Sequence, residues 1–250
     1  MKRYICIGAV LILVLLAVAS QAQAQTALPK ITVGVDQSDN PQDLAVTLQI
    51  VLLLTVLSLV PAILVLMTSF TRLVIVFSFL RHALATQQAP PNQIIIGLSL
   101  FLTIFIMAPT GQQINDNALQ PYLSGDISQT EAFEKAQAPV REFMLNQTRE
   151  KDLALMVSLS KGEKPENAQE ISLLVLIPAF IISELRIAFQ IGFLIYIPFL
   201  VLDMVIASVL LSMGMMMLPP MMISLPLKLI LFVLVDGWNL IVGSLVAGFR

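Results

Sequence analysis

Long runs of apolar residues alternate with short polar stretches along this chain. The apolar runs cover residues 44–67, 94–108, 171–182, 187–202, 204–218 and 229–249. A helix needs roughly 20 apolar residues to cross the hydrocarbon core of a bilayer. The pattern therefore predicts an all-α, membrane-associated fold with about four spans. Pro61, Pro178 and Pro198 interrupt the runs and predict broken helices, which makes the count of spans ambiguous.

The first 24 residues have the pattern of a cleavable signal peptide. Lys2 and Arg3 precede an apolar run over residues 5–19, and Ala22 and Ala24 supply the small residues of a cleavage site. We predict cleavage after Ala24, with an uncleaved anchor helix as the alternative. Residues 25–43 are polar and read as an exported leader.

Residues 44–111 are predicted to form an apolar helical hairpin. Its first run continues as an amphipathic stretch, and its turn covers residues 86–93. Arg72, Arg81 and His82 form a positive flank that favours the cytoplasmic side of a membrane. The second run, at residues 94–108, is short for a span.

Residues 112–170 carry 16 of the 30 charged residues and are predicted to form a small, charged, extracytoplasmic helical domain. Ser128 and Glu131 have the spacing of a capping box that opens a helix. Pro139 is predicted to begin another helix, with one face made of Val140, Phe143, Met144 and Gln147. Residues 171–250 then return to apolar helices.

Composition argues against an enzyme. Only 12% of the residues are charged, against about 25% in soluble domains. The single cysteine, Cys6, and the single histidine, His82, leave few ligands for a metal. No phosphate-binding loop, dinucleotide fingerprint or zinc-protease motif is present, and no basic patch suggests nucleic acid. We expect no catalytic site and no cofactor.

Several charges stand in apolar surroundings, where each costs at least roughly 2.5 kcal/mol unless it is paired or solvated. Glu184 and Arg186 are two residues apart, so they need separate partners. Asp203 and Lys228 flank a proline-rich break, and we predict that they form an ion pair within or between subunits. The alternative is that each charge is solvated at a membrane interface.

Half of the twelve methionines fall within ten residues, between Met213 and Met222. Gly214, Pro219, Pro220 and Pro226 are predicted to interrupt any regular helix there. Methionine is flexible and polarizable, so a cluster of it fills a gap of changing shape. The pattern fits a deformable gate, and it also fits a loop packed in a core.

Residues 45–249 resemble the FliP family, the P protein of the flagellar type III secretion export gate. Several segments carry the resemblance: IPAFIISELR at 177–186, YIPFLVLD at 196–203, MGMMMLPP at 213–220, SLPLK at 224–228, DGW at 236–238, LMTSFTR at 66–72 and QQAPPN at 87–92.

The resemblance implies a cone-like helical oligomer of five copies with the flagellar Q and R proteins, beside other export-apparatus membrane proteins. It implies a place in the bacterial inner membrane and flagellar basal body, with periplasm-facing parts and much of the cone above the membrane. Unfolded flagellar subunits would pass through, and Met215, Met216 and Met217 would form a gasket that seals the closed pore.

The resemblance also assigns Glu184, Asp203 and Lys228 to subunit or helix contacts, and Phe143 to subunit packing. Two other functions stay open from the residues alone. One is a proton-coupled membrane carrier that uses Glu184 and Asp203. The other is a structural membrane scaffold with no conducting path.

Overall fold

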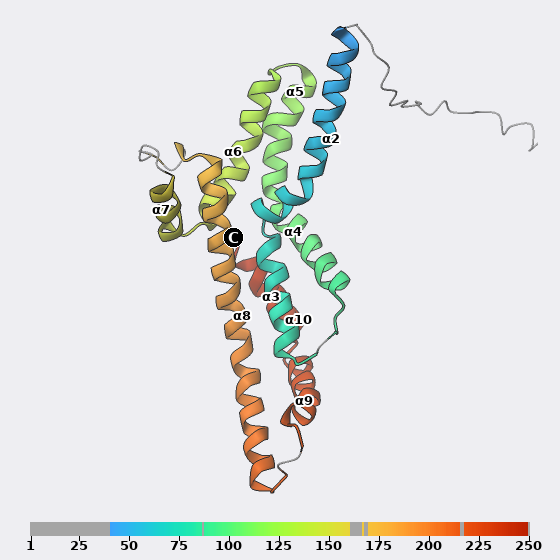
Figure 1. The fold of residues 1–250 in the computed structure, drawn as a ribbon, viewed down its shortest axis with the longest axis vertical. Coiled ribbons are helices and arrows are strands. Elements are labelled where there is room, and N and C mark those ends of the chain that lie inside the picture. Colours follow the sequence, from blue (N-terminus) through green and yellow to red (C-terminus); the bar gives the residue numbers. More distant parts are fainter. Residues whose placement is uncertain (1–40, 87, 161–166, 168–169, 216–217, 250) are drawn as a thin grey trace, which may run out of the picture. The chain divides into compact units, whose positions relative to one another are not determined.

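The computed structural model describes residues 41–249, except residues 87, 161–166, 168–169 and 216–217. Every regular element in these residues is helical, which confirms the predicted all-α fold (Figure 1). The chain divides into two compact units, residues 1–53 and residues 54–250. The predicted signal peptide, its cleavage after Ala24 and nearly all of the leader lie outside the described residues.

Ten helical segments follow one another in the described chain. They are α2 (Pro41–Met67), α3 (Phe70–Ala83), α4 (Asn92–Ile114), the π-helical turn η1 (Asn115–Leu119), α5 (Gln120–Ser124), α6 (Gln129–Gln147), α7 (Glu150–Leu159), α8 (Leu173–Ser212), α9 (Pro220–Leu234) and α10 (Gly237–Ala247).

The second apolar run is longer as a helix than the sequence predicts. Helices α4, η1 and α5 form one helical stretch of 33 residues, Asn92–Ser124, with Pro109 inside α4. This stretch ends at Gly125, whose φ of 82° is a left-handed conformation that glycine adopts without steric cost. The polar residues after Ala108 therefore continue the helix, because no residue before Gly125 leaves the helical backbone.

Pro139 does not begin a helix, so that prediction is wrong. Helix α6 starts ten residues earlier, where the Ser128 hydroxyl accepts a hydrogen bond from the Glu131 amide at 3.3 Å, as the capping pattern predicts. Packing of the α6 face holds both sides of the proline in one helix. Met144 is fully buried on that face, and Val140 and Phe143 pack beside it, as predicted.

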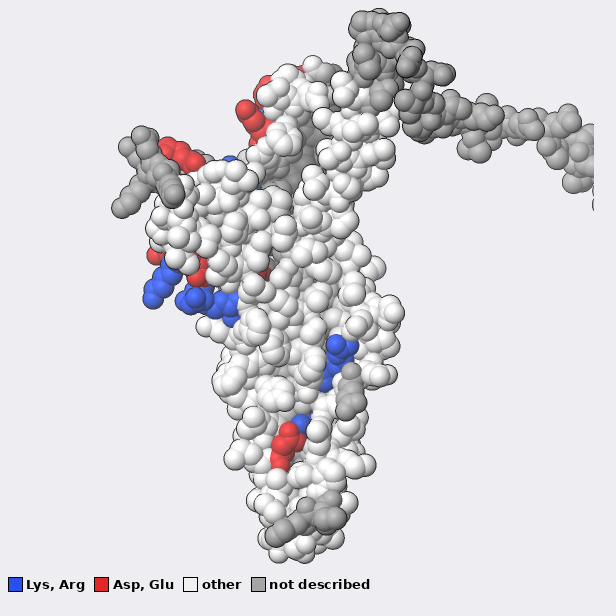
Figure 2. All heavy atoms as spheres, viewed as in Figure 1, with Lys and Arg blue, Asp and Glu red and all other residues white. Residues whose placement is uncertain are grey.

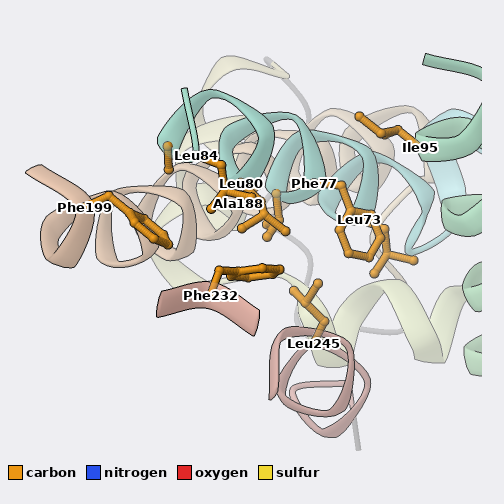
Figure 3. Packing of buried hydrophobic residues seen from close by; sticks show 11 residues of the cluster. Leu73, Phe77, Leu80, Leu84, Ile95, Ala188, Phe199, Phe232 and Leu245 are labelled. Carbon is orange, nitrogen blue, oxygen red and sulfur yellow. The ribbon is translucent and has the colours of Figure 1, made fainter. Parts of the chain in front are cut away.

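Helix α3 lies at the centre of the larger unit and packs along α8. Its side chains Leu73, Val76, Phe77 and Leu80 are almost completely buried, and residues from α4, α8, α9 and α10 close the cluster around them (Figure 3). A second cluster, built on Met144, Ile171, Leu176 and Phe180, joins α6 and α7 to the first turns of α8. These two clusters fix the positions of the charged side chains described below.

Three described helical stretches are long and apolar enough to cross a membrane: Leu48–Met67, Asn92–Ser124 and Leu173–Ser212. A fourth candidate is the pair α9 and α10, which meet at a bend of 63°. Figure 2 shows charged side chains gathered over the α5–α7 region, whereas most of the visible surface over α3, α8 and α9 carries none. The division into domains at residues 111 and 170 stays a prediction.

Candidate functional site

The methionine-rich segment forms the tip of a hairpin between α8 and α9. Helix α8 ends with the Gly214 amide bonded to the Leu211 carbonyl at 3.1 Å and the Met215 amide bonded to the Leu210 carbonyl at 3.0 Å. Gly214 has a φ of 73°. These bonds make a Schellman motif, which satisfies the last carbonyls of a helix and turns the chain sharply. Pro219 and Pro220 then start α9. Pro226 lies inside α9, so the prediction that it interrupts the helix is wrong.

The described methionines at this tip project away from the core. Met213, Met221 and Met222 are 63%, 58% and 72% exposed, and Met215 is 43% exposed. Met216 and Met217, which belong to the predicted gasket, lie outside the described residues. In the isolated chain, the described part of the segment is thus an exposed apolar surface and not a loop packed in the core.

Further along the hairpin from the tip, an ion pair joins its two arms. The Lys228 ammonium of α9 lies 2.6 Å from Asp203 Oδ2 of α8, so the predicted pair forms within one chain. Lys228 is buried and also donates to the Ala83 carbonyl at 3.4 Å, which ties the pair to the end of α3. Asp203 Oδ1 is buried and has no hydrogen-bond partner in the described part of the chain.

A second ion pair joins α3 to α8. The Arg72 guanidinium donates from Nε to Glu184 Oε2 at 2.8 Å and from Nη2 to Glu184 Oε1. Glu184 is fully buried and Arg72 is 3% exposed. Gln147 of α6 accepts a further bond from Arg72 Nη2 at 3.1 Å. A bidentate geometry of this kind is the strong form of an arginine–carboxylate pair.

The burial of Arg72 was not foreseen from the sequence, which placed this residue in a positive flank on the cytoplasmic side of a membrane. Sequence spacing could not reveal its partner, because Glu184 lies 112 residues away. The signal available in the sequence was the lone carboxylate of Glu184 in an apolar run, which requires some cationic partner.

The neighbouring Arg186 has a different partner, as the two-residue spacing predicts. It lies 3.5 Å from Asp152 Oδ1 of α7, and its own side chain is half exposed. Asp152 is buried and accepts a hydrogen bond from the Ser183 hydroxyl at 2.9 Å. Sequence analysis missed Asp152 and Ser183, because Asp152 stands among other charges in a polar segment.

Asp236-Gly237-Trp238 makes the bend between α9 and α10. Asp236 has a left-handed backbone with a φ of 50°. A Cβ on Gly237 would lie 2.2 Å from the Phe232 ring, so any larger residue would force that ring to move. Trp238 packs against Phe232 and Phe77, with ring centroids 5.5 and 6.5 Å apart. The motif is a structural corner.

Phe143, predicted to join subunit packing, packs within its own chain. Its ring meets Phe180 edge-on at 6.0 Å and stacks on Phe249 at 6.3 Å. Among the described residues, no group of three or more histidine, cysteine or acidic side chains is placed to hold a metal ion. The arrangement offers paired charges that join helices and an exposed methionine tip.

Known proteins resemble this chain over most of its length. Residues 53–245 match the model of the FliP family. This chain belongs to the FliP family. The flagellar biosynthetic protein FliP of Bacillus subtilis is 58% identical to it over 87% of this chain and 98% of its own length. The FliP of Caulobacter vibrioides is 50% identical over 97% of this chain and 91% of its own length. The FliP of Aquifex aeolicus is 53% identical over 82% of this chain and 86% of its own length.

Proposed function

We propose that this protein takes part in flagellar biosynthesis as a membrane subunit of the flagellar type III export gate, where it serves in transport and not in catalysis. The observation that carries the proposal is its identity of 50% or more, over most of its length, to flagellar biosynthetic proteins. Several copies, with the Q and R proteins, would enclose a path for unfolded flagellar subunits.

The α8–α9 hairpin tip is the candidate closure of that path. Its described methionines are exposed in the isolated chain, so in an oligomer they are free to meet the same side chains of neighbouring copies. Flexible thioethers converging on one axis would close around a chain of changing shape, and an apolar constriction also stops ions by excluding water. Met215, Met216 and Met217 are the proposed gasket.

The ion pair of Asp203 with Lys228 supports this role by bracing the hairpin. The tip begins at Met213, ten residues beyond Asp203, or about 15 Å along a helix. The unpartnered Asp203 Oδ1 is an acceptor for which a neighbouring subunit would supply a donor. We propose Glu184, Asp203 and Lys228 as the charges that hold the helices, and through them the subunits, in register.

The first test is the native mass of the detergent-extracted protein, made alone and with the Q and R proteins. A ring of several copies that grows when the partners are present is expected. A monomer or dimer that ignores both partners would contradict the export-gate assembly and favour the carrier.

Ion conductance of the assembled complex tests the gasket. Replacing Met215, Met216 and Met217 together by alanine should raise the leak of the closed complex about tenfold or more, because three side chains per copy would no longer fill the axis. A control replaces Met107, which lies in α4 and outside the methionine-rich segment. Unchanged conductance in an assembled triple variant would refute the gasket and leave a scaffold.

The proton-coupled carrier is the second candidate, and it makes different demands on the charges. Within this chain, Glu184 accepts hydrogen bonds from Arg72, and Asp203 accepts one from Lys228. A carrier cycle would have to break both pairs. Proton uptake in vesicles that is lost in a Glu184→Gln variant of normal assembly would favour the carrier over the gate.

A further inference from the structure

We propose that Phe249, two residues beyond α10, is a positioning residue that seals the buried pair of Arg72 and Glu184. The segment from α9 to Phe249 then acts as a strap that secures two ion-paired carboxylates of α8, Asp203 at one end and Glu184 at the other. The inference concerns this chain by itself and does not depend on the export-gate proposal.

The contacts of Arg72 leave one face of its guanidinium for Phe249. Hydrogen bonds to Glu184 and Gln147 occupy edge nitrogens of the group. The faces of a guanidinium carry no donors, and an aromatic ring is the side chain that suits them. Arg72 Cζ lies 3.8 Å from the centroid of the Phe249 ring. The ring therefore covers a charge that is otherwise enclosed by protein.

Phe249 is itself held from the other side. Its ring stacks on Phe143 of α6, with an interplanar angle of 17°. Phe143 in turn meets Phe180 of α8 edge-on. Side chains from α3, α6 and α8 and Phe249, two residues beyond α10, thus meet around one ion pair.

The same two helices reach the other carboxylate of α8. Lys228 of α9 binds Asp203, which lies 19 residues from Glu184, or about 28 Å along the helix axis. Between these contacts the strap turns by 63° at the corner formed by Asp236 and Gly237. Lys228 of α9 binds Asp203 of α8, and Phe249 covers Arg72 of α3, the partner of Glu184. The strap therefore contacts both ion pairs of α8, at two separated points along this length.

The proposal is tested on the full-length protein in detergent by chemical unfolding. Phe249→Leu should shift the unfolding equilibrium constant roughly 5- to 30-fold toward the unfolded state, the range expected for losing a partly to fully desolvated cation–aromatic contact. In Phe249→Tyr, which keeps the ring, the unfolding equilibrium constant should stay within about threefold of the value for the unchanged protein. Phe189→Leu, which removes an exposed ring packed on Phe79, is the control for ring loss alone.

A fluorine series separates the cation–aromatic contact from packing. Placing one, two and three fluorines on the ring at position 249 weakens the electrostatic attraction for a cation while changing ring size little. Stability should fall stepwise with each fluorine, and hydrogen exchange of the α10 amides should speed up in the same order. A flat series, or a Phe249→Tyr variant as unstable as Phe249→Leu, would overturn the proposal. Because both readouts use the isolated chain, either result leaves the export-gate proposal to its own test.

Discussion

Asp203 and Glu184, two acidic residues of the apolar C-terminal region, each have a cationic partner, and only the partner of Asp203 could be predicted from the sequence. Asp203 and Lys228 were predictable as a pair because they flank one hairpin, and a hairpin brings equidistant positions together. Glu184 was recognisable as a buried acid, but its partner Arg72 comes from a helix more than a hundred residues earlier. A contact of that kind depends on how α3 packs against α8, which no local pattern encodes.

Reversing the charges of the hairpin pair gives a prediction at this scale. Asp203→Lys or Lys228→Asp alone should destabilise the protein by roughly 2 kcal/mol, less than the 3–5 kcal/mol of a fully buried pair, because the Asp203 side chain is 37% exposed. The double reversal should recover part of the loss. The unfolding midpoint in detergent measures both effects.

The exposed pair of Glu131 and Lys135 serves as the control for that experiment. These residues are one helical turn apart, and both side chains are more than 40% exposed. Reversing them should change stability by no more than roughly 0.5 kcal/mol. If the double reversal at 203 and 228 is no better than the single variants, the direct pairing does not stabilise the chain.

At the scale of elements, periodicity and turn chemistry predicted the helices well and their ends poorly. The apolar runs became helices, and Gly214 with the two prolines ended α8 and began α9 as expected. Internal prolines misled the reading, because all of them lie inside unbroken helices: Pro61 in α2, Pro139 in α6, Pro178 and Pro198 in the 40 residues of α8, and Pro226 in α9. Packing on both sides of a proline outweighs its local cost in these helices.

The close approach of α3 and α8 gives a prediction for one glycine. A Cβ on Gly192 would lie 2.5 Å from the Phe79 ring and 3.0 Å from Phe79 Cβ, so the ring cannot simply rotate away. Gly192→Ala should therefore cost roughly 1–3 kcal/mol through overpacking. Thermal unfolding of the purified protein measures the effect.

Gly97 in α4 provides the matched control, because a Cβ there would meet nothing within 4 Å. Gly97→Ala should leave stability unchanged or raise it by about 0.5–1 kcal/mol, since alanine favours a helix interior. Equal effects of the two substitutions would mean that α3 and α8 do not approach each other as closely as the structure indicates.

At the scale of the whole molecule, the lengths of the apolar helices are compatible with two positions relative to the membrane. Counting runs predicts simple spans, whereas the resemblance to the export gate implies that much of the assembled protein lies above the membrane. The burial of Arg72 removes part of the evidence for a cytoplasmic flank after α2, because an arginine inside the fold does not report on membrane orientation. The decisive segment is Asn92–Ser124, a single helical stretch about 50 Å long and so longer than the hydrocarbon core.

Cysteine labelling at the two ends of that segment distinguishes the placements. The chain has one cysteine, so a Cys6→Ser parent offers a background without labelling. With the Q and R proteins present, we expect both Ser124→Cys and Gln88→Cys to react with a membrane-impermeant maleimide added from outside the inner membrane, because an assembled cone would hold the whole segment above the bilayer. Reaction at position 124 with protection at position 88 would instead show that α4 crosses the membrane, and the predicted height of the assembly would then be wrong.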